Sequence, residues 1–315
     1  MRAIIFETHG SPDVLQLSEV APPEPGPGQV RVAIHAAGTN PVDAGNRRDG
    51  SWAGLQLPAI PGYDASGTID AVGPGVTAFA RGDEVFYMAD FLGNSHGTYA
   101  EYHVVNATLI AHKPKNLTHI EAAALPLAAG TAYEMVIRRL ALTRGEWVLL
   151  YGAAGGVGSL ALQMAAAQGA RVIAIARAHH HALLQDLGAI ACIDYTTQDI
   201  LAKVQAIADG KVDGVIDCVG GETLARSLPT IKPYGRAASI VGLTGNLDLV
   251  LDMNLTLHGV LVRPDQTRLV ALSQLISAGT LRPIVDQVLP LEEAAQAHRR
   301  LETHHGRGKI VLAMR

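Results

Sequence analysis

The sequence predicts an α/β protein with two lobes, a β-rich lobe followed by a doubly wound parallel sheet. The chain has 315 residues, which exceeds the ~250 residues at which a single core usually divides. Its first third alternates short β-like runs with glycine and proline, and its middle third alternates apolar runs with helical patterns. The composition, with 48% apolar and 17% charged residues, can fill two cores.

The first lobe is expected to be built of β-hairpins. Pro22–Gly28 reads PPEPGPG and is a turn within this lobe, because proline removes a donor and glycine permits unusual dihedral angles. The candidate strands are Arg2–Phe6, Val30–Ala36, Gly67–Val72, Glu84–Tyr87 and Tyr99–Val105.

The second lobe is expected to be a series of βαβ units around a parallel sheet. Between its first two strands, apolar residues recur at helical spacing and predict a helix that ends at Gly169. After Val262 the sequence predicts two more helices, the first over Thr267–Ser277, and strands over Ile284–Leu289 and Lys309–Leu312. The candidate strands of the sheet are Trp147–Tyr151, Arg171–Ala176, Ala191–Ile193, Gly214–Cys218, Ala237–Val241 and Leu257–Leu261.

Composition and charge argue against several other classes of protein. The formal net charge is −4, and no basic stripe with interleaved aromatic residues suits a nucleic acid. Glu7 and His9 interrupt the apolar run that a signal peptide needs, and no run of ~18 apolar residues follows. The only two cysteines, Cys192 and Cys218, lie in apolar strand-like runs, which fits a reducing compartment. A cytoplasmic location is therefore expected.

A phosphate-binding turn is predicted where the strand Trp147–Tyr151 runs into Gly152-Ala-Ala-Gly-Gly-Val-Gly158 and then into a helix. Small residues let the backbone approach a pyrophosphate, whose charge is stabilised at the helix N-terminus. The candidate contacts are Ala154, Gly155, Gly156 and Val157. The alternative is an ordinary glycine-rich turn, which the following βα alternations disfavour.

The end of the second strand of this lobe favours NADPH over NADH. An NAD enzyme places an acid here for the ribose 2′-hydroxyl, but no acid occurs between Arg171 and Gln185. Arg177 stands where a 2′-phosphate would arrive, with His179 and His180 nearby. The alternative is that these residues only begin a solvated helix. A metal site in His179–His181 is disfavoured, because adjacent side chains point apart.

The sequence resembles the zinc-independent quinone oxidoreductases, the branch of the medium-chain dehydrogenase/reductase superfamily that includes zeta-crystallin. The resemblance begins at the AxxGGVG turn and extends over essentially the whole chain. Further matching segments in family order are Ala37–Asp43, Pro61–Gly67, Val72–Val76, Gly82–Val85, Leu125–Pro126, Gly130–Glu134, Asp217–Gly221, Ser239–Gly242 and Gly308–Leu312.

This resemblance implies a GroES-like β lobe over residues 1–122, a Rossmann domain over 123–262, and a segment over 263–315 that returns to the first lobe. It also implies dimers that pair through the Leu257–Leu261 region, for which an apolar edge strand gives a physical motive.

The resemblance further implies roles for individual residues. Asn40 would lie beside the nicotinamide and the acceptor, Asp43 would brace its loop, and Thr131 would contact the carboxamide. Tyr63 would donate a hydrogen bond to the acceptor, although a packed tyrosine with a satisfied hydroxyl is an equal alternative. Tyr195 and Arg177 would flank the 2′-phosphate, with His180 at a position where similar proteins often carry lysine. The nicotinamide ribose would be lined by Val219, Val241 and Gly242.

No zinc is expected in this chain. The first catalytic ligand of the zinc-dependent relatives falls near Ala37 and Gly38, and Tyr63 and Asp64 replace the histidine and glutamate of their PGHE motif. Two cysteines cannot form a structural four-cysteine site. A site improvised from Asp90, His96 and His103 is disfavoured, because isolated histidines are usually satisfied by their surroundings.

The sequence therefore predicts an NADPH-dependent oxidoreductase that transfers hydride to a quinone or a similar electrophilic carbonyl acceptor. Without a Lewis acid to generate an alkoxide, reduction of an already electrophilic acceptor is favoured. The first alternative is an NADPH-dependent enoyl or alkenal double-bond reductase. The second is a non-catalytic role as a crystallin or RNA-binding protein, which the intact phosphate turn and the acidic balance disfavour.

Overall fold

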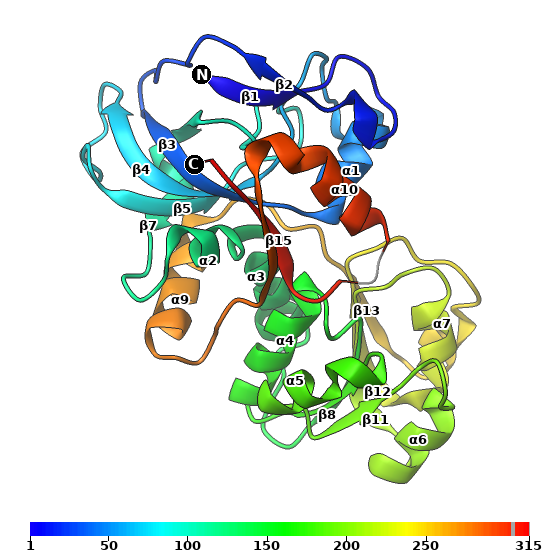
Figure 1. Cartoon of the computed structure of the whole chain (residues 1–315). Coiled ribbons are helices and arrows are strands. Elements are labelled where there is room, and N and C mark those ends of the chain that lie inside the picture. Colours follow the sequence, from blue (N-terminus) through cyan, green and yellow to red (C-terminus); the bar gives the residue numbers. More distant parts are fainter. Residues whose placement is uncertain (304–305, 315) are drawn as a thin grey trace. The chain divides into compact units, whose positions relative to one another are not determined.

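The computed structural model describes residues 1–303 and 306–314, and it divides into two compact units (Figure 1). Unit 1 comprises Met1–Ala128 together with Arg263–Arg315, and unit 2 comprises Ala129–Val262. The segment after Val262 thus belongs to the same unit as the N-terminal third of the chain.

Unit 1 is built on a mixed seven-stranded sheet. The strand order is β14-β15-β3-β4-β5-β7, and β6 pairs with β3. In the part of the sheet that the structure describes, only β14 and β15 run parallel to each other, while the other pairs are antiparallel. The strands are β3 (Gln29–Gly38), β4 (Asp64–Val72), β5 (Glu84–Met88), β6 (Tyr102–Asn106), β7 (Ile110–His112), β14 (Val285–Pro290) and β15 (Lys309–Ala313). The C-terminal strand therefore lies inside the sheet, next to β3.

The remaining elements of unit 1 surround this sheet. A small hairpin consists of β1 (Arg2–Ile5) and β2 (Gln16–Glu19). The helices are α1 (Pro41–Arg48), α2 (His119–Ala123), α9 (Gln266–Ser277) and α10 (Ala294–Glu302), and α3 (Pro126–Tyr133) runs across the boundary into unit 2. The helix α1 begins directly after β3, because Asn40 takes an extended conformation as its N-cap and Pro41 is tolerated in the first turn.

Unit 2 is built on a six-stranded parallel sheet with the order β10-β9-β8-β11-β12-β13. The strands are β8 (Trp147–Tyr151), β9 (Arg171–Ile175), β10 (Ala191–Ile193), β11 (Val212–Asp217), β12 (Ile231–Ser239) and β13 (Thr256–Gly259). Counted along the unit, this is the order 3-2-1-4-5-6 of a Rossmann sheet, which confirms the predicted fold class. The order reverses between β8 and β11, and ligands of such sheets bind at the carboxyl ends of the strands at that point.

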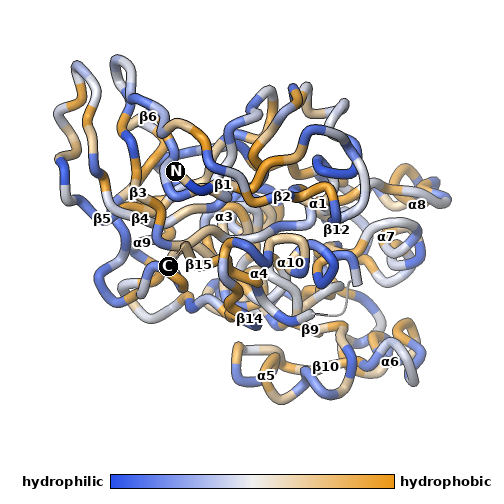
Figure 2. Tube along the Cα trace, turned by 45° about the horizontal axis from the view of Figure 1, so that its top comes forward, coloured by the Kyte–Doolittle hydropathy of each residue, from blue (hydrophilic) through white to orange (hydrophobic). Residues whose placement is uncertain are grey.

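Five helices connect the strands of unit 2, namely α4 (Gly156–Ala167), α5 (His181–Asp186), α6 (Ile200–Ile207), α7 (Thr223–Ser227) and α8 (Asp248–Asp252). The hydrophobic residues along α4 can be followed in Figure 2. Leu160, Ala161 and Met164 of this helix are buried, as the predicted apolar stripe requires. The helix ends just before Gly169, whose φ of 80° stops it.

Each unit has its own hydrophobic core. The core of unit 1 joins side chains of β3, β4 and β5 to residues of α10 and β15, among them Val32, Phe86, Ala297 and Leu312. The core of unit 2 is formed on its parallel sheet by residues such as Leu149, Ile173 and Val215. No helix among the described residues is long and apolar enough to span a bilayer.

Several predicted strand boundaries were wrong. The strand β12 begins at Ile231 rather than Ala237, and it continues through Pro233 and Gly235 although these residues signal a turn. Tyr234 accommodates this path with a φ of 63° and donates its N–H to the carbonyl of Met253. At the other end of the sheet, β13 stops at Gly259 rather than Leu261.

Boundaries also differ in unit 1. The strand β4 begins at Asp64, three residues before the predicted start, and β6 begins at Tyr102 rather than Tyr99. The backbone of Tyr99 is instead bonded to Pro61 and Ile4. Such pairings join distant segments and leave no local pattern in the sequence.

Candidate cofactor and active site

The predicted phosphate turn forms an open helix N-terminus in unit 2. The chain leaves β8 at Gly152, which has a φ of 69°, and the N–H of Gly155 donates to the carbonyl of Gly152 over 3.0 Å. Gly155 is the N-cap of α4 and has no side chain to accept the free N–H groups of the first turn. Gly155, Gly156 and Val157 are half-buried and Ala154 is buried. This arrangement suits an anion that accepts hydrogen bonds from the backbone.

The turn lies at the reversal of strand order. A Cβ on Gly152 would stand 3.2 Å from Cβ of Cys218 and 3.3 Å from Cγ2 of Val219, which follow β11. The glycine thus lets the ends of the two central strands approach each other. The phosphate turn and the loop after β11 therefore border the crevice in which Rossmann sheets hold a dinucleotide.

Arg177 and Tyr195 are in contact just beyond the carboxyl ends of β9 and β10. The Nε–H of Arg177 donates to the hydroxyl of Tyr195 over 3.1 Å, and Tyr195 is 48% exposed. His180 follows, and its ring lies 3.9 Å from that of His179 between centroids. The pair of Arg177 and Tyr195 offers a cation and a hydroxyl on an accessible surface, a donor set that suits a phosphate.

Asp194 is an acid near this surface that the sequence analysis did not consider. Its Oδ2 accepts the N–H of Ala178 over 3.0 Å, and its Oδ1 accepts the N–H and hydroxyl of Thr196. The hydrogen bonds from Thr196 hold the pKa of Asp194 below its usual range. Because these groups occupy both oxygens, Asp194 acts as a brace for the loop that carries Arg177.

The loop after β11 is shaped by Asp217, a residue of the Asp217–Gly221 segment for which the sequence alone predicted no role. Its Oδ1 accepts the N–H groups of Val219 and Gly220 over 2.9 and 3.0 Å, and its Oδ2 accepts the hydroxyl of Ser239 over 3.0 Å. Two predicted ribose contacts, Val219 and Val241, are consequently 57% and 39% exposed at the ends of neighbouring strands. Gly242 follows and is also exposed.

Thr131, which is predicted to contact the carboxamide, lies on α3 and is buried with 4% of its surface exposed. Its predicted contact with the carboxamide therefore stays a prediction.

In unit 1, Asn40 and Asp43 form the start of α1. The Oδ2 atom of Asp43 accepts the backbone N–H of Asn40 and the hydroxyl of Tyr99, each over 2.8 Å. Asp43 is fully buried, and this burial raises its pKa to about 7, although the two hydrogen bonds act in the opposite direction. The predicted bracing residue is thus a carboxyl group that titrates near neutral pH.

The side chain of Asn40 belongs to a buried charged cluster that we call the Lys309 cluster, formed by Thr39, Asn40, Asp64 and Lys309. Asn40 donates from Nδ2 to Oδ2 of Asp64 over 2.9 Å, and the ammonium of Lys309 lies 3.3 Å from the same oxygen. Lys309 also donates to Oδ1 of Asn40 and to the carbonyl of Thr39. Burial raises the pKa of Asp64, and the charge of Lys309 lowers it. Sequence reasoning missed Asp64 and Lys309 as site residues.

Tyr63 is 1% exposed and lies beside α1. Its hydroxyl accepts the Nδ2–H of Asn46 over 2.7 Å, and its ring packs edge-on against Phe91 with 5.7 Å between centroids. Burial raises the pKa of the phenol well above its usual value. The hydroxyl therefore keeps its own hydrogen and can donate it to an acceptor.

We expect the variant Asp43→Asn to gain stability relative to wild type as pH rises. The folded-state pKa of Asp43 lies above its usual value near 4, so the stability it contributes is present below about pH 4 and is lost as pH rises towards 7. The amide variant has no proton to lose, and its NH₂ group can approach Oδ1 of Asn46, one turn away and without a partner. Urea unfolding measures the free energy of unfolding of both proteins at pH 5 and pH 8. The difference between Asp43→Asn and wild type should shift by about 2 kcal/mol in favour of the variant from pH 5 to pH 8. A pH-independent difference would contradict this.

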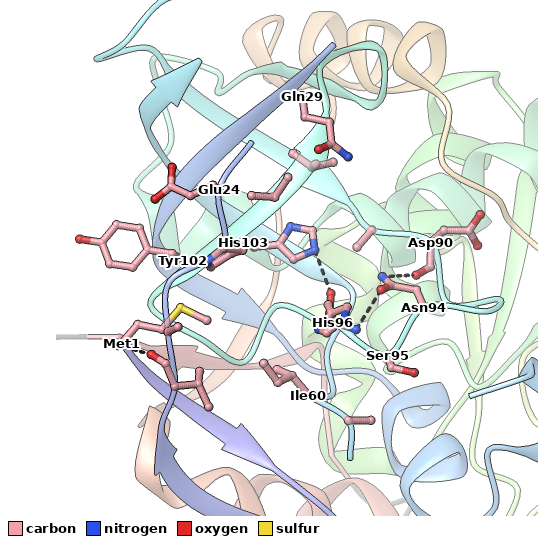
Figure 3. A pocket seen from close by; sticks show the side chains of 18 of the residues that line it. Met1, Glu24, Gln29, Ile60, Asp90, Asn94, Ser95, His96, Tyr102 and His103 are labelled. Carbon is pink, nitrogen blue, oxygen red and sulfur yellow. Dashed lines mark hydrogen bonds between the residues drawn. The ribbon is translucent and has the colours of Figure 1, made fainter. Parts of the chain in front are cut away.

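The three residues considered for an improvised metal site, Asp90, His96 and His103, line a cavity of about 640 Å³ in unit 1 (Figure 3). Most of its other walls are apolar. His103 donates from Nε2 to the carbonyl of His96 over 3.0 Å, so its Nδ1 accepts from the hydroxyl of Tyr87. Burial lowers the pKa of His103 to about 4. Among the described residues no group of three metal-ligating side chains comes together. The expectation of a metal-free chain stays a prediction.

Models of two domain families match the chain. The model of the alcohol dehydrogenase GroES-like domain matches residues 26–115, and that of the zinc-binding dehydrogenase matches residues 187–312. The first match covers β3 to β7 and confirms the GroES-like lobe.

Two curated relatives match almost the whole chain. A quinone oxidoreductase of Pseudomonas aeruginosa is 33% identical over 326 residues, which cover 99% of this chain and 99% of that protein. An NADPH-dependent alkenal/one oxidoreductase from the chloroplast of Arabidopsis thaliana is 35% identical over 99% of this chain and 79% of its own length.

Solved structures agree with these matches. A crystal structure of an NAD-dependent alcohol dehydrogenase superposes with a TM-score of 0.94 at 35% identity and covers 100% of both chains. The quinone oxidoreductase of Escherichia coli in complex with NADPH superposes with a TM-score of 0.91 at 30% identity, over 99% of this chain and 100% of that one.

Proposed function

The chain belongs to the quinone oxidoreductase branch of the medium-chain dehydrogenase/reductase superfamily, and from this membership we propose that it reduces a quinone or a similar electrophilic carbonyl acceptor with NADPH. Its relatives are NAD(P)H-dependent oxidoreductases of the quinone oxidoreductase and alkenal reductase type. The observation that carries the proposal is the open N-terminus of α4 beside the Arg177 and Tyr195 pair.

The residues of unit 2 fit a dinucleotide with a 2′-phosphate. The free N–H groups at Gly156 and Val157 would hold the pyrophosphate beside Gly155, whose own N–H is engaged by the carbonyl of Gly152. Arg177 with Tyr195 would hold the 2′-phosphate. When bound, NADPH supplies the hydride for the reduction. The accessible side chains of Val219 and Val241 would exclude water beside it.

The residues of unit 1 would orient the acceptor. Asn40 presents an amide whose oxygen and one N–H are already engaged, so its direction is fixed. Tyr63 keeps its phenolic hydrogen and would donate a hydrogen bond to the acceptor oxygen, while water supplies the proton that completes the reduction. Orientation of this kind can supply several kcal/mol of the barrier reduction.

A steady-state screen tests the proposal. Oxidation of NADPH is followed by absorbance with quinones, enones, enals and ketones in parallel, and quinones should give the highest kcat/KM. Turnover with none of the four classes would refute the proposed activity.

A second candidate is reduction of an alkenal double bond, which the similarity to the Arabidopsis protein favours. Both reactions consume NADPH, so the products must be identified. Formation of a saturated aldehyde with deuterium from labelled NADPH on its β carbon, at a higher kcat/KM than any quinone, would establish the second function in place of the first.

The variant Arg177→Ala should bind NADPH more weakly than wild type does, with little change in its affinity for NADH. We expect wild type to bind NADPH at least about tenfold tighter than NADH, because a charge-assisted contact to the 2′-phosphate contributes about 1 to 3 kcal/mol. Fluorescence titration of both coenzymes measures the ratio of dissociation constants, which should approach one in the variant. The control is Arg171→Ala at the start of β9, at the opposite end of the strand from Arg177, and the guanidinium of Arg171 lies 4.0 Å from the ring centroid of Trp147. Equal affinities in wild type, or an unchanged ratio in Arg177→Ala, would remove Arg177 from the site.

We also propose that two copies pair along β13. This strand is at the edge of its sheet and pairs only with β12, and Leu261 just beyond it is 60% exposed. Light scattering should give twice the mass of one chain, and a monomer at micromolar concentration would contradict the pairing. A cytoplasmic location stays a prediction.

A further inference from the structure

Lys309 places a buried ammonium group against the side chain of Asn40. It is 5% exposed, and the strand that carries it is anchored on both sides of the residue. Its backbone N–H donates to Ile284 over 2.8 Å, and the carbonyl of the next residue, Ile310, accepts the N–H and the hydroxyl of Thr39. The base of the lysine side chain is therefore held between the segment before β14 on one side and the segment after β3 on the other.

All three hydrogens of the Lys309 ammonium have acceptors. They are the carbonyl of Thr39 at 2.7 Å, Oδ1 of Asn40, and Oδ2 of Asp64 at 3.3 Å. An ammonium group has three donors and no acceptor capacity. Lys309 therefore has no free hydrogen to offer a substrate and no lone pair with which to accept a proton.

The contacts of Lys309 determine which way the Asn40 amide faces. Its oxygen faces the ammonium and one N–H faces Asp64, so a flip of the amide would place its NH₂ group against the cation. Among the described residues, no acceptor contacts the second N–H. Asn40 is 2% exposed, and this second hydrogen is the one that the proposed function assigns to a ligand.

We propose that Lys309 is a positioning residue for the reduction, which acts by fixing the amide of Asn40 towards the coenzyme and acceptor. The proposal rests on the proposed function, since it needs Asn40 at the reaction site. The C-terminal strand thereby supplies a part of the active site. Loss of the ammonium leaves the oxygen of Asn40 without this donor and the amide held only by its contact with Asp64. The misorientation that follows is expected to lower kcat by about 10- to 100-fold.

The test compares Lys309→Met with Lys113→Met. Lys113 is also a buried lysine of unit 1, and it donates to the carbonyl of Leu117 over 2.6 Å and lies 3.3 Å from Glu84. Both variants lose a buried ammonium, so both should have a lower melting temperature. Only Lys309→Met should lower kcat, with the dissociation constant of NADPH within about twofold of wild type. A normal kcat in Lys309→Met, or an equal loss in Lys113→Met, would overturn the proposal.

A cycle with Asn40→Ala shows whether Lys309 acts through Asn40. If it does, the double variant Asn40→Ala/Lys309→Met has the same kcat as Asn40→Ala alone. If the two residues act independently, the fold reductions in kcat of the two single variants multiply. If Asn40→Ala itself keeps the wild-type kcat, the proposed active site fails. If Asn40→Ala is slow and Lys309→Met is not, only the present inference fails.

A second readout does not depend on turnover. With asparagine labelled by ¹⁵N, the side-chain amide signal of Asn40 in the coenzyme-free protein should move in Lys309→Met and stay in place in Lys113→Met. An unmoved signal would contradict the proposal. Should Lys309→Met fail to fold, the double variant Lys309→Met/Asp64→Asn takes its place, because it leaves no charge in the Lys309 cluster. Its kcat and its Asn40 amide signal are then compared with those of Asp64→Asn.

Discussion

Asp64→Ala is expected to lower the free energy of unfolding by about 3 to 5 kcal/mol. The carboxylate is fully buried, and its partner Lys309 is 5% exposed, so removing it leaves a buried cation without its counter-charge. The same change removes the acceptor of the Leu127 N–H at 2.7 Å and of the Asn40 amide at 2.9 Å. The loss of these two hydrogen bonds adds to the cost.

Lys309→Met should lower the free energy of unfolding by less than Asp64→Ala does, because Asp64 can take up a proton when the ammonium is absent. Burial raises its pKa, and without Lys309 the main opposing charge is absent. The double variant should therefore cost less than the sum of the two single variants, which urea unfolding measures directly.

The control is an exposed ion pair of unit 2, Glu222 and Arg226, with 2.6 Å between its charged atoms. Glu222→Ala should change the free energy of unfolding by less than about 0.5 kcal/mol. A similarly small change in the free energy of unfolding of Asp64→Ala would show that the cluster does not stabilise the fold. If the changes in Asp64→Ala and Lys309→Met simply add in the double variant, the two residues do not stabilise each other.

The parts of the fold that depend on local patterns could be predicted from the sequence. The strands Trp147–Tyr151 and Ala191–Ile193 have the predicted bounds, and the turn from Gly152 to Gly158 joins a strand to a helix as its glycines indicate. Arg177 and Tyr195 were assigned to the same surface from the resemblance, and they are in contact. For the two strands and the turn, a few adjacent residues carry the signal.

The Lys309 cluster could not be predicted, because its members are far apart in the chain. Asp64 and Lys309 are separated by 245 positions, and they meet only because β15 pairs with β3 and β3 pairs with β4. Neither periodicity nor turn chemistry encodes that register. A lysine in an apolar C-terminal strand was the one signal available, since a buried lysine needs partners.

Asp217 and Asp43 illustrate a second limit. Both occur in the motifs that carried the resemblance, but their roles come from hydrogen bonds that only the folded loops define. The raised pKa of Asp43 depends on complete burial, which a residue in the first turn of a short helix does not predict. Sequence reasoning could therefore single out these segments, whereas the hydrogen bonds of both residues and the raised pKa of Asp43 required the structure.

Gly158→Ala is expected to unfold unit 2 or to destabilise it by more than about 3 kcal/mol. A Cβ at this position would lie 2.1 Å from the carbonyl oxygen of Gly152 and 2.8 Å from its carbon. Both are backbone atoms of the strand-to-helix turn, so no side chain can move aside, and α4 would have to shift away from the sheet. Coenzyme binding should be lost together with the fold.

The matched variant is Gly155→Ala in the same turn. Its Cβ would lie 3.3 Å from the same carbonyl oxygen, and the φ of −73° suits any residue, so unit 2 should remain folded. The added methyl group instead occupies the half-buried surface that the pyrophosphate needs, which should weaken NADPH binding with little change in melting temperature. Circular dichroism and fluorescence titration of both variants separate the two effects. A wild-type melting temperature in Gly158→Ala would show that the turn is not closely packed, and wild-type affinity in Gly155→Ala would place the phosphates elsewhere.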